Sequence, residues 1–120
     1  MGLSTHVLDT YHGTPAAGMA VTLYQTHGDT GESATLVKRF VLNADGRNPD
    51  GPLYDNASLQ RGTYRLVFEV AGYFRLRGLT LPEPPFLGRV SLDFGVADTT
   101  QHYHVPLLCS PWAYSTYRGS

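Results

Sequence analysis

Residues 63–70 read Thr-Tyr-Arg-Leu-Val-Phe-Glu-Val, and their apolar and polar side chains alternate. Alternation with a period of two is typical of a β-strand that buries one face. The apolar face would carry Tyr64, Leu66, Phe68 and Val70, and the polar face Thr63, Arg65 and Glu69. The sequence therefore predicts a strand over 63–70 with one side in a core and the other in solvent.

The same alternation recurs outward from this segment in both directions. It is clear over 89–96 and weaker over 3–9, 19–25, 35–42, 101–108 and 113–117, with a further short strand expected near 52–54. Turn residues separate the segments at 13–15, 45–46 and 49–51. Residues 72–79 lack alternation and are expected to form one short helix, followed by an extended proline-rich linker. Short strands between frequent turns predict an all-β sandwich.

Composition narrows the class of protein. The chain has 120 residues, which fits one domain spanning 1–120. Its 9 Lys and Arg against 10 Asp and Glu give a net charge of −1, so neither nucleic acid nor a membrane is expected as a partner. We expect no signal peptide and no membrane-spanning segment. Cys109, the single cysteine, is flanked by apolar residues and is expected to be a buried, unreactive thiol in a reducing compartment such as the cytoplasm.

Alternation also predicts which way the histidines face. In 101–108 the apolar set Tyr103, Val105 and Leu107 would face the core, which turns His102 and His104 outward. In 3–9 the same reasoning places His6 on the outer side. His6 and His104 can therefore share an outer sheet face. His12 and His27 lie in turn-rich stretches and are expected to be ordinary solvated side chains, while His102 would support its neighbours.

The C-terminal region is unusually aromatic for one buried face. Pro106, Leu108, Trp112, Tyr114 and Tyr117 exceed what a single core can absorb, so a second subunit is expected to cover part of them. Because such contacts are usually two-fold, the outer face would form a site that symmetry duplicates. The strand pattern continues into residues 115–120, and we expect this tail to have a fixed position.

The chemistry that these residues allow is hydrolysis by activated water. No nucleophile elbow, phosphate-binding glycine loop or metalloprotease helix motif is present. A histidine can accept a proton from water near neutral pH, and Arg47 in the turn Asn-Ala-Asp-Gly-Arg, residues 43–47, could hold developing negative charge. A zinc site formed by His6, His102 and His104 is an alternative of low specificity, because a His-x-His pair is common and no carboxylate or cysteine motif supports it.

Four stretches together resemble the transthyretin-related 5-hydroxyisourate hydrolases. They are Leu-Ser-Thr-His-Val-Leu-Asp-Thr at 3–10, Asn-Ala-Asp-Gly-Arg at 43–47, His-Tyr-His-Val-Pro-Leu-Leu at 102–108 and Tyr-Ser-Thr-Tyr-Arg-Gly-Ser at 114–120. The resemblance runs through nearly the whole chain, and the terminal Tyr-Arg-Gly-Ser is its most specific part. It implies a transthyretin-like β-sandwich of two four-stranded sheets with one short helix. It also implies a homotetramer, a dimer of dimers, with a channel between the dimers.

The resemblance further implies an activity and a set of site residues. The activity is hydrolysis of 5-hydroxyisourate, a product of urate oxidation, without metal or organic cofactor. Apart from the resemblance, a bacterial cytosol is the compartment that fits the sequence best. His6, Arg47 and His104 match the family's catalytic positions. Substrate-binding positions correspond to the tail residues Tyr117, Arg118, Gly119 and Ser120. Residues 26–35 and 86–90 depart from the family pattern without touching these positions. A transthyretin-like carrier of small aromatic molecules is the alternative, although a carrier has no use for two imidazoles and a guanidinium in its channel.

Overall fold

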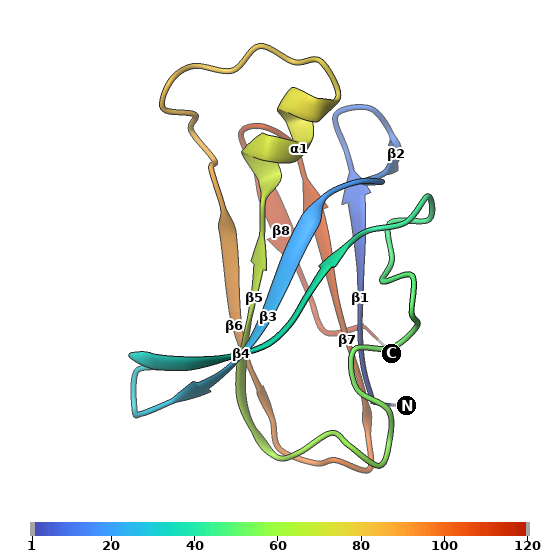
Figure 1. Cartoon of the computed structure of the whole chain (residues 1–120), viewed down its shortest axis with the longest axis vertical. Coiled ribbons are helices and arrows are strands. Elements are labelled where there is room, and N and C mark those ends of the chain that lie inside the picture. The colour runs from blue at the N-terminus through green and yellow to red at the C-terminus, as the bar shows by residue number, and fades with distance from the viewer. Residues whose placement is uncertain (1, 120) are drawn as a thin grey trace.

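The computed structural model describes residues 2–119, which fold into eight strands and one helix. Their bounds are β1 Gly2–Asp9, β2 Thr14–Pro15, β3 Ala20–His27, β4 Ser33–Val41, β5 Gly62–Phe68, α1 Val70–Leu76, β6 Val90–Val96, β7 His102–Cys109 and β8 Tyr114–Thr116. The strands form two four-stranded sheets, with the helix at one end (Figure 1). This confirms the expected sandwich of two four-stranded sheets with one short helix.

One sheet has the strand order β2-β1-β7-β8, and the other has the order β4-β3-β5-β6. In the first sheet β1 runs parallel to β7, so residues 2–9 lie beside residues 102–109. All pairings in the second sheet are antiparallel. The inner faces bury Leu3, Val7 and Leu107 from the first sheet against Leu23, Leu66 and Phe68 from the second. The core is therefore built from the alternate positions that the sequence indicated.

The strand predicted over 63–70 ends earlier than expected. It stops at Phe68, and Val70 instead begins α1, which runs over 70–76 rather than 72–79. Val70 is still fully buried, together with Tyr73 and Phe74 on the inner side of the helix. Val70 lies at the junction and is buried both by the strand pattern with its period of two and by the helix pattern with its period of 3.6. Its apolar character therefore did not show whether it belongs to a strand or to a helix.

Two further segments differ from the sequence predictions. Residues 13–15 were expected to form a turn, but Thr14–Pro15 is the short edge strand β2, paired with the end of β1. An edge position tolerates proline because its missing N–H would face away from the sheet. The expected strand near 52–54 is reduced to one bridge between Tyr54 and Leu3. Segments of two or three residues are too short for alternation to distinguish a strand from a turn.

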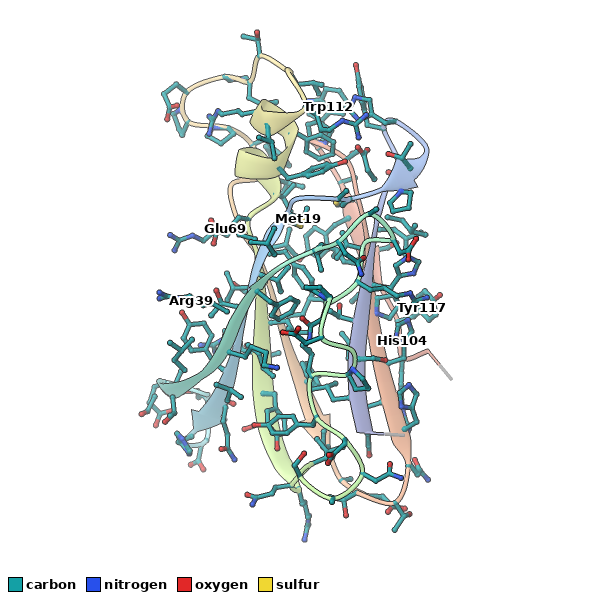
Figure 2. The ribbon with its side chains drawn as sticks, turned by 45° about the vertical axis from the view of Figure 1, so that its right-hand side comes forward. Met19, Arg39, Glu69, His104, Trp112 and Tyr117 are labelled. Atoms are coloured by element: carbon teal, nitrogen blue, oxygen red, sulfur yellow. The ribbon has the colours of Figure 1, made fainter. Side chains whose placement is uncertain are left out.

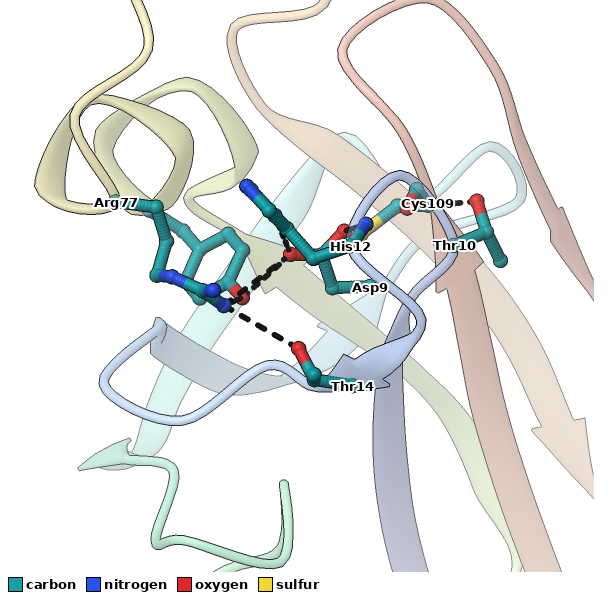
Figure 3. Close-up of polar contacts among 7 residues, drawn as sticks. Asp9, Thr10, His12, Thr14, Arg77 and Cys109 are labelled. Carbon is teal, nitrogen blue, oxygen red and sulfur yellow. Dashed lines mark hydrogen bonds and ion pairs between the residues drawn. The ribbon is translucent and has the colours of Figure 1, made fainter.

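A buried carboxylate connects the first sheet to the helix. The Asp9 side chain is fully enclosed, and its Oδ2 accepts hydrogen bonds from the Tyr73 hydroxyl at 2.7 Å and the His12 ring at 2.5 Å. Arg77 donates to Tyr73 and to Thr14 beside it (Figure 3). The expectation that His12 is an ordinary solvated histidine was therefore wrong, because the turn folds its ring back onto Asp9.

Candidate active site

His6 and His104 lie on the outer face of the first sheet, as predicted. In the parallel register of β1 and β7, Ser4 is opposite His104 and His6 is opposite Pro106, so both histidines project from the same side. Both rings are partly exposed, whereas Tyr103, Val105 and Leu107 are buried on the inner side. Figure 2 shows His104 and Tyr117 on the opposite side of the molecule from Arg39 and Glu69.

Residues 43–47 form a turn that brings Arg47 to this face. The Asn43 side-chain oxygen accepts hydrogen bonds from the backbone N–H groups of Asp45 and Arg47 at 2.9 and 3.1 Å. Gly46 then accepts a hydrogen bond from the backbone N–H of Val7 at 2.9 Å, which docks the turn against β1. Gly46 has φ of +74°, and a Cβ there would lie 2.5 Å from the Val7 carbonyl oxygen. Only glycine fits this approach.

The docked turn places a guanidinium beside an imidazole. Nη2 of Arg47 lies 3.5 Å from Nδ1 of His6. Burial and the positive charge of Arg47 lower the pKa of His6, although Asp45 partly offsets them. Because the cationic form is disfavoured, the neutral form of His6, which can accept a proton, is favoured.

His104 is shifted in the same direction. Its pKa is lowered by burial first, then by the charge of Arg47 and by the neighbouring histidines His102 and His6, although a hydrogen bond with the Ser4 backbone partly offsets them. The influence of Arg47 on both imidazoles means that the three groups share one electrostatic environment. The structure therefore brings together the three side chains that the sequence singled out as catalytic candidates.

Ser4 joins two of the histidines, a contact that the sequence reasoning missed. Its Oγ lies 2.8 Å from Nδ1 of His104 and 3.2 Å from Nε2 of His102. The two rings are nearly parallel, with centroids 6.3 Å apart. The available signal was the i, i+2 spacing of Ser4 and His6, which places both on one strand face. Which groups Ser4 contacts depends on β7, about 100 residues away in sequence.

The C-terminal tail returns to His104. The Gly119 N–H donates to the His104 carbonyl at 2.7 Å, and a Cβ at Gly119 would lie 2.6 Å from Cδ2 of the His104 ring. Tyr117 is 61% exposed. The Arg118 guanidinium turns away, because it lies 4.1 Å from the centroid of the Tyr103 ring and donates to Gln101. Ser120 lies outside the described residues.

A cavity of about 260 Å³ opens beside Arg47 and is lined in part by Ser4, Arg47 and His102, but not by His6 or His104. Among residues 2–119, no group of three or more His, Cys, Asp and Glu side chains is arranged to hold a metal ion. Nε2 of His102 and Nδ1 of His104 both lie within hydrogen-bond distance of the Ser4 hydroxyl instead. These described residues do not form the three-histidine zinc site considered above.

Cys109 lies on the inner side of β7, on the opposite face of the sheet from His104. Its side chain is fully buried, and burial together with the Asp9 carboxylate raises the pKa of the thiol to about 12. A thiol in this state is not a nucleophile at neutral pH. This matches the expectation of an unreactive thiol.

No helix of the described part of the chain is long and apolar enough to cross a membrane.

Known proteins resemble the chain over nearly its full length. It is 54% identical over 119 residues to the 5-hydroxyisourate hydrolase of Deinococcus radiodurans, covering 99% of this chain and 96% of the relative. It is 52% identical over 118 residues to 5-hydroxyisourate hydrolase 2 of Rhizobium meliloti, covering 98% and 95%. The structure of Klebsiella pneumoniae 5-hydroxyisourate hydrolase matches with a TM-score of 0.78 at 34% identity, covering 100% of both chains.

Residues 3–119 match the HIUase/Transthyretin family. The matched segment includes β1, the turn 43–47, β7 and the tail up to Gly119, so it contains every described residue of the outer-face site. The chain therefore belongs to the HIUase/Transthyretin family.

Proposed function

We propose that the chain hydrolyses 5-hydroxyisourate to 2-oxo-4-hydroxy-4-carboxy-5-ureidoimidazoline. The observation that carries this proposal is the placement of the Arg47 guanidinium beside His6, from which it also acts on His104. Two imidazoles kept neutral next to a fixed positive charge suit attack by water on a planar, oxygen-rich ring. Relatives at about half identity that are named for this reaction support the assignment.

The reaction breaks a lactam C–N bond in the six-membered ring. One imidazole takes a proton from water, whose oxygen adds to the lactam carbonyl carbon. The carbonyl oxygen then gains negative charge, which the Arg47 guanidinium is suited to hold because it always carries donors. When the C–N bond breaks, its electron pair goes to nitrogen, and the nitrogen receives a proton. His6 and His104 divide these proton transfers between them.

The tail residues would bind and enclose the substrate. Gly119 lies against the His104 ring, and its small size leaves room for the imidazole on the outer face of the first sheet. Tyr117 lies at another cavity of the single chain, together with Tyr103 and Arg118, and would line the substrate pocket once the chains assemble. Arg118 and Ser120 belong to the same proposal, in which Arg118 holds the tail through Tyr103 and Gln101 rather than pointing at the substrate.

A non-enzymatic carrier is the alternative that the family allows. The pKa values of His6 and His104 argue against it, because burial and then the positive charge of Arg47 beside them lower both values. A site that only needs to enclose an aromatic molecule gains nothing from such an arrangement, whereas proton transfer requires it.

We further propose a homotetramer, a dimer of dimers, in which neighbouring chains cover the outer face of the first sheet and enclose the site. Apolar side chains next to the site support this assembly, since half-buried Leu8 and Leu108 follow the histidines along β1 and β7. The proposed location is a bacterial cytosol, which fits the bacterial sources of the relatives named above and the single buried thiol of Cys109.

The test is to generate 5-hydroxyisourate from urate with a urate oxidase and to follow its absorbance decay with and without the protein. We expect acceleration in proportion to protein concentration, and full activity after exhaustive chelation. Decay at the spontaneous rate would remove the hydrolase proposal and leave the carrier. Loss of activity on chelation, restored by zinc, would remove the metal-free chemistry.

A further inference from the structure

His102 has one ring nitrogen in the site and one enclosed in the protein. Its Nε2 faces Ser4 at 3.2 Å, while Nδ1 is buried and has no hydrogen-bond partner among residues 2–119. A neutral imidazole carries its proton on one nitrogen only. Buried N–H groups without an acceptor are rare because they lose a hydrogen bond to water, whereas an unpaired acceptor is tolerated more often. The proton of neutral His102 therefore belongs on Nε2, where it is donated to Ser4.

This donation fixes the direction of the next hydrogen bond. Ser4 Oγ accepts from His102, so its own hydrogen is available for the other described partner, Nδ1 of His104 at 2.8 Å. A nitrogen that accepts this hydrogen is unprotonated, and the proton of neutral His104 then resides on Nε2. The chain of donors runs from His102 through Ser4 to His104.

We infer that Ser4 is a positioning residue, which holds His104 in the tautomer with its proton on Nε2. This rests on the proposed function, because it assigns the share of His104 in that reaction. The N–H at Nε2 of His104 can then bind the lactam oxygen of the substrate or protonate the leaving nitrogen. His6 takes the complementary share. Its Nδ1 is the nitrogen nearest to Arg47, which has only donors, so that nitrogen keeps its lone pair.

The tautomer can be measured without substrate. In protein labelled with ¹⁵N at histidine, the ¹⁵N shifts of the two ring nitrogens at alkaline pH report which one carries the proton. We expect the proton on Nε2 of His104 in the unmodified protein and in Ser4→Thr, which keeps the hydroxyl. Ser4→Ala and His102→Ala should each give a mixture of both tautomers, because each breaks the chain of donors.

Kinetics then connect the tautomer to the reaction. Ser4→Ala is expected to lower kcat about 10- to 100-fold, the range typical for removal of a hydrogen-bond partner that orients a metal-bound histidine, with little change in KM. Ser4→Thr should restore most of kcat. Ser33→Ala is the matched control, since Ser33 is an exposed strand serine of the other sheet and should leave both the tautomer and kcat unchanged.

Each outcome bears on one proposal. A proton on Nδ1 of His104 in the unmodified protein would overturn the inference, as would Ser4→Ala with an unchanged tautomer and unchanged kcat. If the unmodified protein fails to accelerate decay of 5-hydroxyisourate while His104 has the expected tautomer, the reaction is wrong and the hydrogen-bond chain is right.

Discussion

At residue 47, one side chain acts on two imidazoles. Arg47 is exposed, but the turn holds its guanidinium against His6 and within electrostatic reach of His104. Lowering the pKa of both rings keeps them neutral down to a more acidic pH than an unperturbed histidine allows. The same charge is placed to hold the oxyanion of the reaction. These two roles can be separated by experiment.

Arg47→Ala should change both the height and the position of the pH–rate profile. Without the guanidinium, the pKa of His6 and of His104 rises, so the rings become protonated and inactive at a higher pH. The acid limb of kcat/KM therefore moves to higher pH. Loss of oxyanion stabilisation should lower the alkaline plateau about 10²- to 10³-fold. Arg39→Ala removes an exposed arginine of the other sheet and should leave the profile unchanged. An acid limb that stays in place in Arg47→Ala would contradict the electrostatic role.

Gly119 is a second residue whose identity is set by contact. In Gly119→Ala, the new Cβ would approach Cδ2 of His104 to 2.6 Å, so the ring or the tail must move. We expect a loss of kcat of at least about tenfold, because misplacing a catalytic group by a fraction of an ångström is costly, with unchanged unfolding in urea. Gly88→Ala, where no atom lies within 4 Å of the new Cβ, is the control. Equal activity of the two variants would show that the tail can move away from the new Cβ without displacing the His104 ring.

At the scale of elements, the turn 43–47 matters through its docking on β1. Gly46→Ala requires a left-handed backbone from alanine, costing about 1–2 kcal/mol, and adds the clash with the Val7 carbonyl. Gly13→Ala is closely matched, since Gly13 has the same φ of +74° but nothing within 4 Å of its Cβ. Both variants should lose stability in urea unfolding, but only Gly46→Ala should lose activity, because only it displaces Arg47. Similar activity in both would count against docking as the reason for the glycine.

The second element-scale feature is the Asp9 network between β1 and α1. Burial alone would raise the pKa of Asp9, but hydrogen bonds from the His12 backbone, the Tyr73 hydroxyl and the His12 ring outweigh it and hold the pKa below its usual value. A carboxylate whose pKa is lowered by folding stabilises the protein above its unfolded pKa of about 3.9. That contribution disappears as the pH falls through the lower, folded value.

Asp9→Asn should therefore lower the free energy of unfolding at pH 7 by about 1–3 kcal/mol, the cost of leaving buried donors poorly paired. The gap from the unmodified protein should narrow below pH 4, as the native carboxylate itself becomes protonated. Urea titrations at several pH values measure this gap. Asp29→Asn, in an exposed loop, is the control. A gap that does not depend on pH would show that the charge of Asp9 contributes nothing.

At the scale of the whole molecule, the outer face of the first sheet is divided. One half carries Ser4, His6 and His104, and the adjoining half carries Leu8 and Leu108, which are opposite each other in the register. The second sheet also exposes an apolar side chain, Val41, at 56%. The apolar half of the first sheet is where the proposed tetramer would bring another chain against the site.

Leu108→Glu should reduce both the assembly and the activity. Analytical ultracentrifugation of the unmodified protein is expected to give four times the chain mass of 13.2 kDa, and Leu108→Glu a smaller species. The reason is that an unpaired carboxylate would be buried between chains. Val41→Glu, on the other sheet, should keep the full mass and full activity. A monomer with full activity would show that one chain forms the site alone.

Much of the fold could be predicted because alternation is a local property. Side chains two apart on a strand face the same way whatever lies next to them, so Leu3 and Val7 were assigned inward and His6 outward without coordinates. The tail and the turn 43–47 were recognised by resemblance to a family. The tetramer, the substrate-binding role of the tail and the catalytic roles remain predictions.

Contacts between distant segments were beyond the sequence and were decided by the tertiary structure. The bridge from Ser4 to His102 and His104 spans 98 and 100 residues, and it exists only because β1 pairs with β7 in one parallel register. The capture of His12 by Asp9 and the fit of Gly119 against His104 likewise arise from where the chain folds back. Alternation fixes the side on which a residue lies, whereas the register between strands fixes its neighbours, and no local pattern specifies register.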